Sequence, residues 1–469
     1  MEQRGIELVP ASERYGRPRD LLFLWAGTTT TVFTVVYGTI VVAMGLSFWQ
    51  AVAAIVIGNL LAFPLVGFSS IQGMQHGTST MAISRAAYGN KGARVLGFFG
   101  WLNMVGFEAG GMVMITLAGL TLLKQAGVEG EGLGLKVAIV LIAAVIQLIL
   151  PLIGHAAVMK AQKYLTWVFV AMFVVMAILV APKANLTAGG SADFSTFTLA
   201  VMLVMSGGGL SWAPLGGDYS RYLPVDSSRK AVFGYAFLGG FVPYLLLMIL
   251  GAAVATVVTN ASDPISGLPG ALPSWFVVPY LLLTVVTLFA ANTTDLYSSG
   301  LNLQAAGIRI KRWAAVVLDL IFCVIITFVA ITSDSFNTML NAFLGLVVVW
   351  LAPLGGHLRH RLAAPQGRLR RRLAVRRERA WPDPLGGPDR PGGRHARRGA
   401  LAQLQRLRRL AVQRHRRLGL QHLRRLRRRR CRLRRPGPPR GPRQGARPCM
   451  TCSMWPTAAG PPTRSSRTG

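Results

Sequence analysis

A single acidic residue lies inside a long apolar stretch and is the first candidate for chemistry. Glu108 stands in the sequence NMVGFEAGGMVM, residues 103–114, with no other charged residue in that stretch. Because a charged side chain is costly inside a membrane, an intramembrane Glu is a functional candidate by default. Its carboxyl group can accept N–H groups of a ligand or bind a proton. A protonated or paired Glu that only supports the structure is the alternative.

Two further stretches combine polar side chains with residues that interrupt helices. In SGGGLSWAP, residues 206–214, three glycines precede Ser211 and Trp212, so backbone amides and carbonyls can face a ligand there. In GTTTT, residues 27–31, one glycine precedes four threonines. The alternatives are close helix packing at the glycines, and threonine hydroxyls that bond to carbonyls of their own helix.

The motifs favour binding over catalysis. We recognise no Ser-His-Asp arrangement, no H-E-x-x-H and no phosphate-binding loop, so we expect no enzyme. Cys449 and Cys452 form one C-x-x-C without a second pair, and no zinc site is expected. His76 and His155 fall in or near loops, and we assign them no role.

The elements that carry these residues are predicted to be membrane-spanning helices. The chain is 52% hydrophobic with a mean hydropathy of +0.43, which is typical of an all-α polytopic membrane protein. A span needs about 20 apolar residues, and it must be helical because lipid offers no hydrogen bonds. We place ten such spans at residues 21–46, 49–71, 95–122, 134–153, 163–182, 197–217, 231–258, 276–299, 313–332 and 336–355.

Charges between the spans predict the orientation. With a cytoplasmic N-terminus, 15 basic residues fall on the cytoplasmic side and three, Lys124, Lys136 and Lys183, on the other. This asymmetry is the one that the positive-inside rule predicts. The interrupted spans are the first and the sixth, five apart, which favours a transporter built from a five-plus-five inverted repeat.

The last 114 residues have a different composition. Residues 1–355 carry a net charge of +4, whereas residues 356–469 hold 33 Arg, no Lys and three acids, a net of +30. This tail also lacks Ile, Phe, Tyr and Asn, as expected of GC-rich DNA read in the wrong frame. We therefore predict a cytoplasmic N-terminus (1–20), a transporter core (21–355) and a disordered out-of-frame tail (356–469). A tail that binds anionic lipid or RNA, or a non-functional product, is the alternative.

The first 355 residues resemble the nucleobase:cation symporter family, in its purine–cytosine permease branch. The resemblance is carried by GLSWAPLGGDYSRYLP (209–224), GLSFWQAVAAIVIGNLLAF (45–63), GTSTMAISRAAYGNKGARVLGFFGWLNMVGF (77–107) and TTDLYSSGLNLQAAG (293–307). It implies the LeuT-like five-plus-five fold, of which ten helices are retained here and helices eleven and twelve are lost. It also implies import of a nucleobase such as cytosine or a purine, or of a related heterocycle, across the cytoplasmic membrane by alternating access.

The resemblance places the substrate between helices one, three, six and eight. Its implied contacts are a stacking aromatic, hydrogen-bonding groups and the opened backbone of helix six: Phe107, Glu108, Asn103, Gly208, Gly209, Ser211, Trp212 and Asn292. Asn103 is equally suited to helix–helix bonding, and Trp212 to packing. Asp218, Tyr219 and Arg221 are interpreted as structural or gating residues.

The coupling ion is expected to be Na⁺ or H⁺, with no other cofactor and no specific nucleic-acid partner. The resemblance implies a sodium site made of the hydroxyls of Thr293 and Thr294 with carbonyls of Gly27, Thr28 and Thr31. Oxygen ligands of this kind suit a hard cation. Asp295 is the alternative group for a cation or proton, and Glu108 keeps the proton alternative open.

Overall fold

The computed structural model describes residues 2, 4–128 and 132–332, and within these residues the chain is helical. Nine membrane spans fit the described part by length and composition, if one bent pair of helices counts as a single span. The tenth expected span and the Arg-rich tail lie outside the described residues. The long helices are α1 Asp20–Thr29, α2 Val32–Ala43, α3 Phe48–His76, α4 Thr80–Gln125, α5 Leu133–Ile153, α6 His155–Val180, α7 Phe194–Met205, α9 Arg229–Ala255, α10 Ser274–Ala305 and α11 Arg312–Thr332.

The first span is broken at the threonine run. Helices α1 and α2 meet at an angle of 57°, and Thr30 and Thr31 between them have non-helical backbones. The Thr31 amide donates to the Thr29 carbonyl at 3.0 Å. In a continuous helix the Thr31 amide would donate to the Gly27 carbonyl. The break therefore removes the usual helical partner of the Gly27 carbonyl. The break therefore lies three residues beyond the glycine, within the predicted stretch.

The sixth span is broken at the triple glycine, as the sequence predicts. Helix α7 runs into a π-helical turn, η3 Ser206–Leu210, where Gly208 has φ −100° and ψ −131°. The short helices η4 Ala213–Leu215 and α8 Gly216–Ser220 complete the span. Both broken spans expose backbone groups at mid-helix, where a ligand can replace the missing helical partner.

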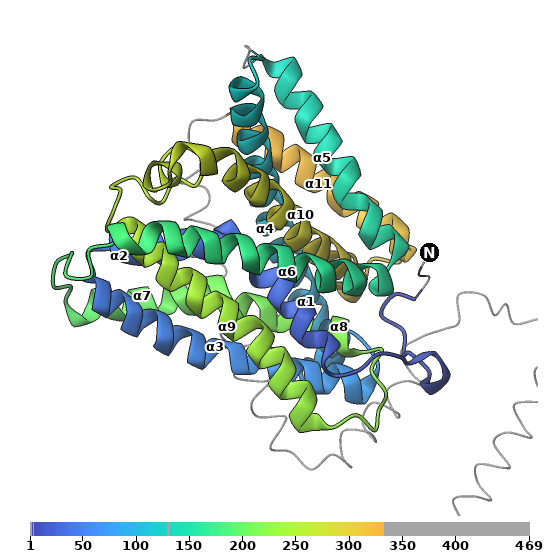
Figure 1. Cartoon of the computed structure of the whole chain (residues 1–469). Helices are drawn as coiled ribbons and strands as arrows, with labels where there is room; N and C mark the ends of the chain where they lie inside the picture. Colours follow the sequence, from blue (N-terminus) through green and yellow to red (C-terminus); the bar gives the residue numbers. More distant parts are fainter. Residues whose placement is uncertain (1, 3, 129–131, 333–469) are drawn as a thin grey trace, which may run out of the picture. The chain divides into compact units, whose positions relative to one another are not determined.

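The spans pack in two groups, and α6 lies between them. Helix α9 packs on α1, α2 and α3, and α3 also packs on α7 and α8; we call this the first group. Helices α4, α5, α10 and α11 pack on one another and form the second group. Figure 1 shows the second group in the upper part of the view, with α3, α7 and α9 below.

Glycines allow the closest approach within the first group. A Cβ at Gly38 of α2 would lie 1.9 Å from the Met248 carbonyl of α9, and a Cβ at Gly251 would lie 1.9 Å from the Val35 carbonyl. Real Cβ atoms cannot approach so closely, so both positions need glycine for α2 and α9 to pack backbone to backbone.

Helix α4 is longer than its predicted span of 95–122. It begins at Thr80, where the Ser79 side chain caps the Ala82 amide, and it is kinked at Gly89 with φ +70°. Hydropathy missed this first part because Arg85, Lys91 and Arg94 lie in it. Helix α6 likewise begins at His155, eight residues before the predicted start, across Lys160.

Candidate functional site

A cavity lies between the two broken spans. Its empty volume is about 420 Å³, including space open to solvent. The first span and the π-helical turn line one part, and α4, α9 and α10 line the rest. The lining residues are Thr31, Phe33, Tyr37, Met104, Phe107, Gly207, Ser211, Trp212, Tyr244, Ala291, Asn292 and Asp295.

Aromatic rings dominate the cavity wall. Phe33, Tyr37, Phe107, Trp212 and Tyr244 come from four different spans. The Tyr244 hydroxyl donates to the carbonyl of Gly207, one of the groups exposed by the break in the sixth span. Such a wall offers stacking faces to a flat, aromatic ligand.

Two polar side chains on α10 face the same cavity. Asn292 Nδ2 donates hydrogen bonds to the Glu108 backbone carbonyl at 3.0 Å and to Gln147 Oε1 at 3.1 Å. Asp295 is buried, and its Oδ1 has no hydrogen-bond partner among the described residues. A buried carboxyl oxygen without a donor is costly, so a ligand N–H or a cation is suited to this position.

The structure brings together five of the predicted site residues and separates the others. The predicted residues that line the cavity are Thr31, Phe107, Ser211, Trp212 and Asn292. Gly208 and Gly209 instead face α3: a Cβ at Gly209 would lie 2.4 Å from the Phe63 amide nitrogen, and one at Gly208 would lie 3.1 Å from Asn59 Oδ1. Asn103 and Glu108 are buried in α4 but are not among the residues that line the cavity.

Glu108 of α4 interacts electrostatically with another acid, Asp319 of α11. Both side chains are buried. The indole N–H of Trp101, two turns before Glu108 on α4, donates to Asp319 Oδ1 at 2.5 Å. Among the described residues no N–H or hydroxyl group donates to either oxygen of Glu108. Two acids buried near each other, away from water, are candidate groups for binding a proton.

Gln162 of α6 lies between α10 and Gly27 of α1, one of the predicted sodium ligands. Gln162 Nε2 donates to the Ala290 carbonyl of α10 at 2.8 Å, and its Oε1 lies against Gly27 of α1. Gln162 Oε1 and the Thr28 hydroxyl have no hydrogen-bond partner within the described part of the chain. Unpartnered oxygens beside a broken helix fit a hard cation by their donor chemistry.

The threonine hydroxyls of α10 bond to their own helix. Thr293 Oγ1 donates to the Phe289 carbonyl at 2.8 Å, and Thr294 Oγ1 donates to the Ala291 carbonyl at 2.6 Å. Their oxygen lone pairs stay available to a cation. In the described residues no cluster of three or more His, Cys, Asp or Glu could hold a metal ion.

The sequence reasoning missed Tyr37 and Tyr244, and it treated Asp295 only as an alternative ion ligand. A tyrosine within an apolar span needs a partner for its hydroxyl, which was an available signal. The sequence reasoning also assigned no role to His155, which is buried. His155 Nδ1 bonds the Tyr15 hydroxyl at 2.7 Å, and its Nε2 bonds the Tyr219 carbonyl at 2.9 Å.

Asp218 and Tyr219 tie the end of the sixth span to its neighbours. The Thr80 amide donates to Asp218 Oδ1 at 2.9 Å, which joins this span to the start of α4. The Tyr219 hydroxyl donates to the Thr294 carbonyl at 2.8 Å, which joins it to α10. These contacts agree with a structural interpretation of both residues.

Broken spans around a central cavity define a membrane transporter fold. The structure of Mhp1, a nucleobase-cation-symport-1 family transporter in a closed conformation with bromovinylhydantoin bound, matches with a TM-score of 0.63 at 17% identity, over 76% of this chain and 80% of Mhp1. The structure of MhsT in complex with L-phenylalanine matches with a TM-score of 0.53 at 14% identity, over 74% of this chain and 88% of MhsT. At such low identities these matches establish the fold.

Sequence comparison identifies the family. A family model described as permease for cytosine/purines, uracil, thiamine, allantoin matches residues 8–363. The chain therefore belongs to this family of permeases. YxlA of Bacillus subtilis (strain 168), which carries the name "putative purine-cytosine permease", is 34% identical over 307 residues, 64% of either chain. The purine-cytosine permease fcyB of Emericella nidulans is 26% identical and covers 75% of this chain and 71% of its own. The chain thus spans about 64% of the length of YxlA.

Proposed function

We propose that the protein is a secondary active transporter that imports a nucleobase, such as cytosine or a purine, or a related heterocycle. The observation that carries the proposal is the cavity between the two broken spans. Its aromatic wall suits a flat ring, and Asn292 and Asp295 offer the polar groups that such a ring requires. The names of YxlA and fcyB support the same substrate class.

The proposal includes the orientation and the coupling ion. In this proposal the N-terminus is cytoplasmic and the protein lies in the cytoplasmic membrane. The excess of basic residues on one side of the predicted spans supports the orientation. Uptake is coupled to Na⁺ or H⁺. The unpartnered oxygens of Gln162 and Thr28 support sodium, whereas the buried acids Glu108 and Asp319 support a proton.

The decisive experiment is uptake of a panel of labelled nucleobases into cells that express the protein. Two chains are compared: the sequence as it stands, and one in which the reading frame is restored near Gly355. We expect uptake of one base class by the restored chain. Uptake by both chains would show that the part before the Arg-rich tail suffices. Protein present in the membrane without any uptake in either chain would overturn the proposed substrate class.

A variant ties the activity to the cavity. Asp295→Asn removes the acidic group, whose Oδ1 has no partner among the described residues, while keeping the shape of the side chain. We expect uptake at low substrate concentration to fall roughly 10- to 100-fold, as loss of a buried hydrogen bond to the substrate predicts. Asp263→Asn is the matched control, since Asp263 lies in a loop, where its side chain accepts from the amides of Ile265 and Ser266. Equal uptake by the two variants would remove Asp295 from the binding site.

A further inference from the structure

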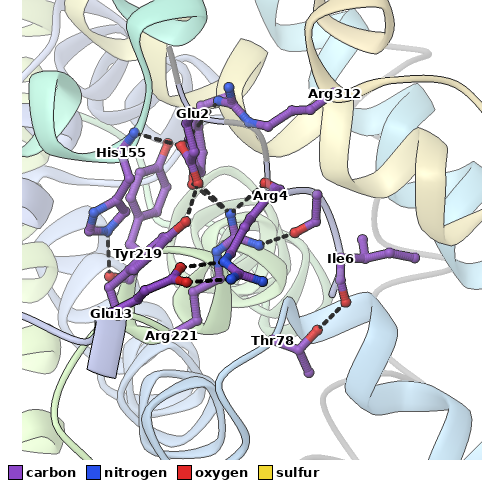
Figure 2. Close-up of polar contacts among 12 residues, drawn as sticks. Glu2, Arg4, Ile6, Glu13, Thr78, His155, Tyr219, Arg221 and Arg312 are labelled. Carbon is purple, nitrogen blue, oxygen red and sulfur yellow. Dashed lines mark hydrogen bonds and ion pairs between the residues drawn. The ribbon is translucent and has the colours of Figure 1, made fainter. Parts of the chain in front are cut away.

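Glu2 is bound by four different elements of the helix bundle. Its carboxylate accepts hydrogen bonds from Arg221 Nη2 at 2.8 Å, the Tyr222 hydroxyl at 2.5 Å and the Tyr297 hydroxyl at 3.1 Å. It also accepts from the His155 amide at 2.8 Å, and Arg312 Nη2 of α11 lies 3.6 Å away. Figure 2 shows Glu2 between His155, Arg221 and Arg312.

Two buried cations share this single carboxylate. The side chains of Arg221 and Arg312 are 0% and 2% exposed, and Glu2 itself is 12% exposed. Within the described residues, Glu2 forms every ion pair that involves either arginine. A buried guanidinium without a counter-charge is strongly unfavourable, so these arginines depend on Glu2 unless water reaches them.

The residues that follow Glu2 are fixed to the same end of the bundle. Arg221 Nη1 donates to the Gly5 carbonyl, and the Thr78 hydroxyl donates to the Ile6 carbonyl at 2.7 Å (Figure 2). The Val9 amide donates to the Gly77 carbonyl at 2.8 Å. We call Glu2 together with residues 4–15 the N-terminal strap.

The strap joins the two packing groups. Its contacts with Gly77, Thr78 and Arg221 are to the ends of α3 and α8 in the first group, and to the start of α4. Its contacts with Tyr297 and Arg312 are to α10 and α11 in the second group. Glu2 also bonds to the turn between α5 and α6, where its amide donates to the Ile153 carbonyl at 3.1 Å. The two groups cannot separate at this end while the strap stays bound.

We propose that the N-terminal strap is a latch that holds the cytoplasmic end of the transport path closed. Glu2 must leave Arg221 and Arg312 before the substrate can exit to the cytoplasm. The direction of opening rests on the proposed function, because alternating access requires the two groups to part first at one end and then at the other. Release exposes both arginines, so water enters as the latch opens.

The latch responds to movement of the helices and not to physiological pH. Burial disfavours the charged form of Glu2, but the charges of Arg221 and Arg312, with the bonds from Tyr222 and His155, outweigh it. Together they lower the pKa of Glu2 to about 2. Glu2 therefore stays ionised throughout the physiological range, and the bond to the arginines has to be broken mechanically.

The test measures access to the closed end without any transport substrate. Ser298 of α10 is buried and follows Tyr297 in the chain, so Ser298→Cys reports on water below the strap. The full chain carries this change with Cys431, Cys449 and Cys452 replaced by Ser, and the native Cys323 is buried. A membrane-impermeant maleimide is added to inside-out vesicles, and the rate of labelling at position 298 is followed.

Glu2→Gln and Glu13→Gln are compared in this background. Glu13 belongs to the same strap, but it pairs with Arg4 at an exposed site and not with the helices. We expect Glu2→Gln to raise the labelling rate roughly tenfold, as loss of a charge-assisted bond predicts. Glu13→Gln is expected to leave the rate unchanged. Equal rates for Glu2→Gln and the parent chain, or equal increases in both variants, would overturn the latch.

Trypsin gives a second readout that does not depend on the introduced cysteine. Arg14 is held by the Met74 carbonyl at 2.6 Å, so a bound strap protects the bond after it. We expect faster cleavage after Arg14 in folded Glu2→Gln than in Glu13→Gln. Slow cleavage in both would contradict the latch. Because neither assay needs a nucleobase, failure of the proposed substrate leaves the result of both assays readable.

Discussion

At the scale of single residues, the two buried acids Glu108 and Asp319 are the candidates for binding a coupling proton. Both are buried, on α4 and α11, and the cavity residue Asn292 donates to the backbone carbonyl of Glu108. Asp295 on α10 and the Cys323 thiol on α11 are the other titratable groups that interact with this pair in the described structure. A proton held by the pair would therefore be linked to occupancy of the cavity.

Glu108→Gln tests this link. If the pair exchanges a proton during transport, a permanently neutral side chain removes that step, so uptake becomes nearly independent of pH. The measurement is initial uptake between pH 5 and pH 8, with Asp319→Asn as the second variant and Asp263→Asn as the control in the loop. A pH profile identical to that of the parent protein would exclude Glu108 from coupling. Loss of uptake on removal of Na⁺ would then favour the oxygens around Gln162.

The sequence predicted some cavity residues and not others for a physical reason. Trp212 and Ser211 follow the triple glycine. The glycines predict a break in the helix, and residues beside such a break are candidates for binding. Tyr244 lies in an ordinary apolar span, and a tyrosine there faces lipid or a cavity depending on the neighbouring helix. Only the packing of α9 against the π-helical turn decides this, through the bond of Tyr244 to Gly207.

At the scale of elements, the contact between α2 and α9 depends on two glycines. Gly251→Ala would place a methyl group 1.9 Å from the Val35 carbonyl. We expect it to destabilise the protein by about 1–3 kcal/mol, because the two backbones must move apart. The measurement is the thermal unfolding midpoint of purified protein in detergent.

Gly234→Ala on the same helix is the matched control. A Cβ at Gly234 would meet nothing within 4 Å, so the helix-forming preference of alanine is expected to leave the midpoint unchanged or raise it. An equal loss of stability in both variants would show that the close approach of α2 and α9 is not the cause.

The breaks in the helices were predictable, whereas the starts of two helices were not. The threonine run indicates the break in the first span, and the triple glycine indicates the break in the sixth, because both weaken the helix locally. The first turns of α4 and α6 contain Arg85 and Lys160. These charged residues lower the local hydropathy, so the predicted spans began after them. Such residues extend a helix beyond the apolar core without any apolar signal.

At the scale of the whole molecule, the strap connects residues that are far apart in sequence. Glu2 and Arg221 are separated by 219 positions, and no periodic pattern in the polar N-terminus predicts their contact. The sequence therefore predicted the helices of the core but not the segment that joins them at one end.

The strap makes a specific contribution to stability that depends on pH. The folded pKa of Glu2 is about 2, below its ordinary value of 4.5. Its contribution, on the order of 3 kcal/mol, is therefore fully present above pH 4.5 and is lost as the pH falls toward 2. We expect the difference in unfolding midpoint between the parent protein and Glu2→Gln to be constant from pH 8 to pH 5 and to shrink below that. A difference that grows on acidification would contradict this assignment.

The backbone contact of α2 with α9 has a consequence for spectroscopy. Helices that touch through glycines on both sides have no side-chain layer that can slide, so they move as one body. Paired spin labels on the outer faces of α2 and α9 will therefore keep a fixed separation throughout the working cycle. The distance between the labels on α2 and α9 is a constant reference, against which changes in the distance between α9 and α10 can be compared in the same sample.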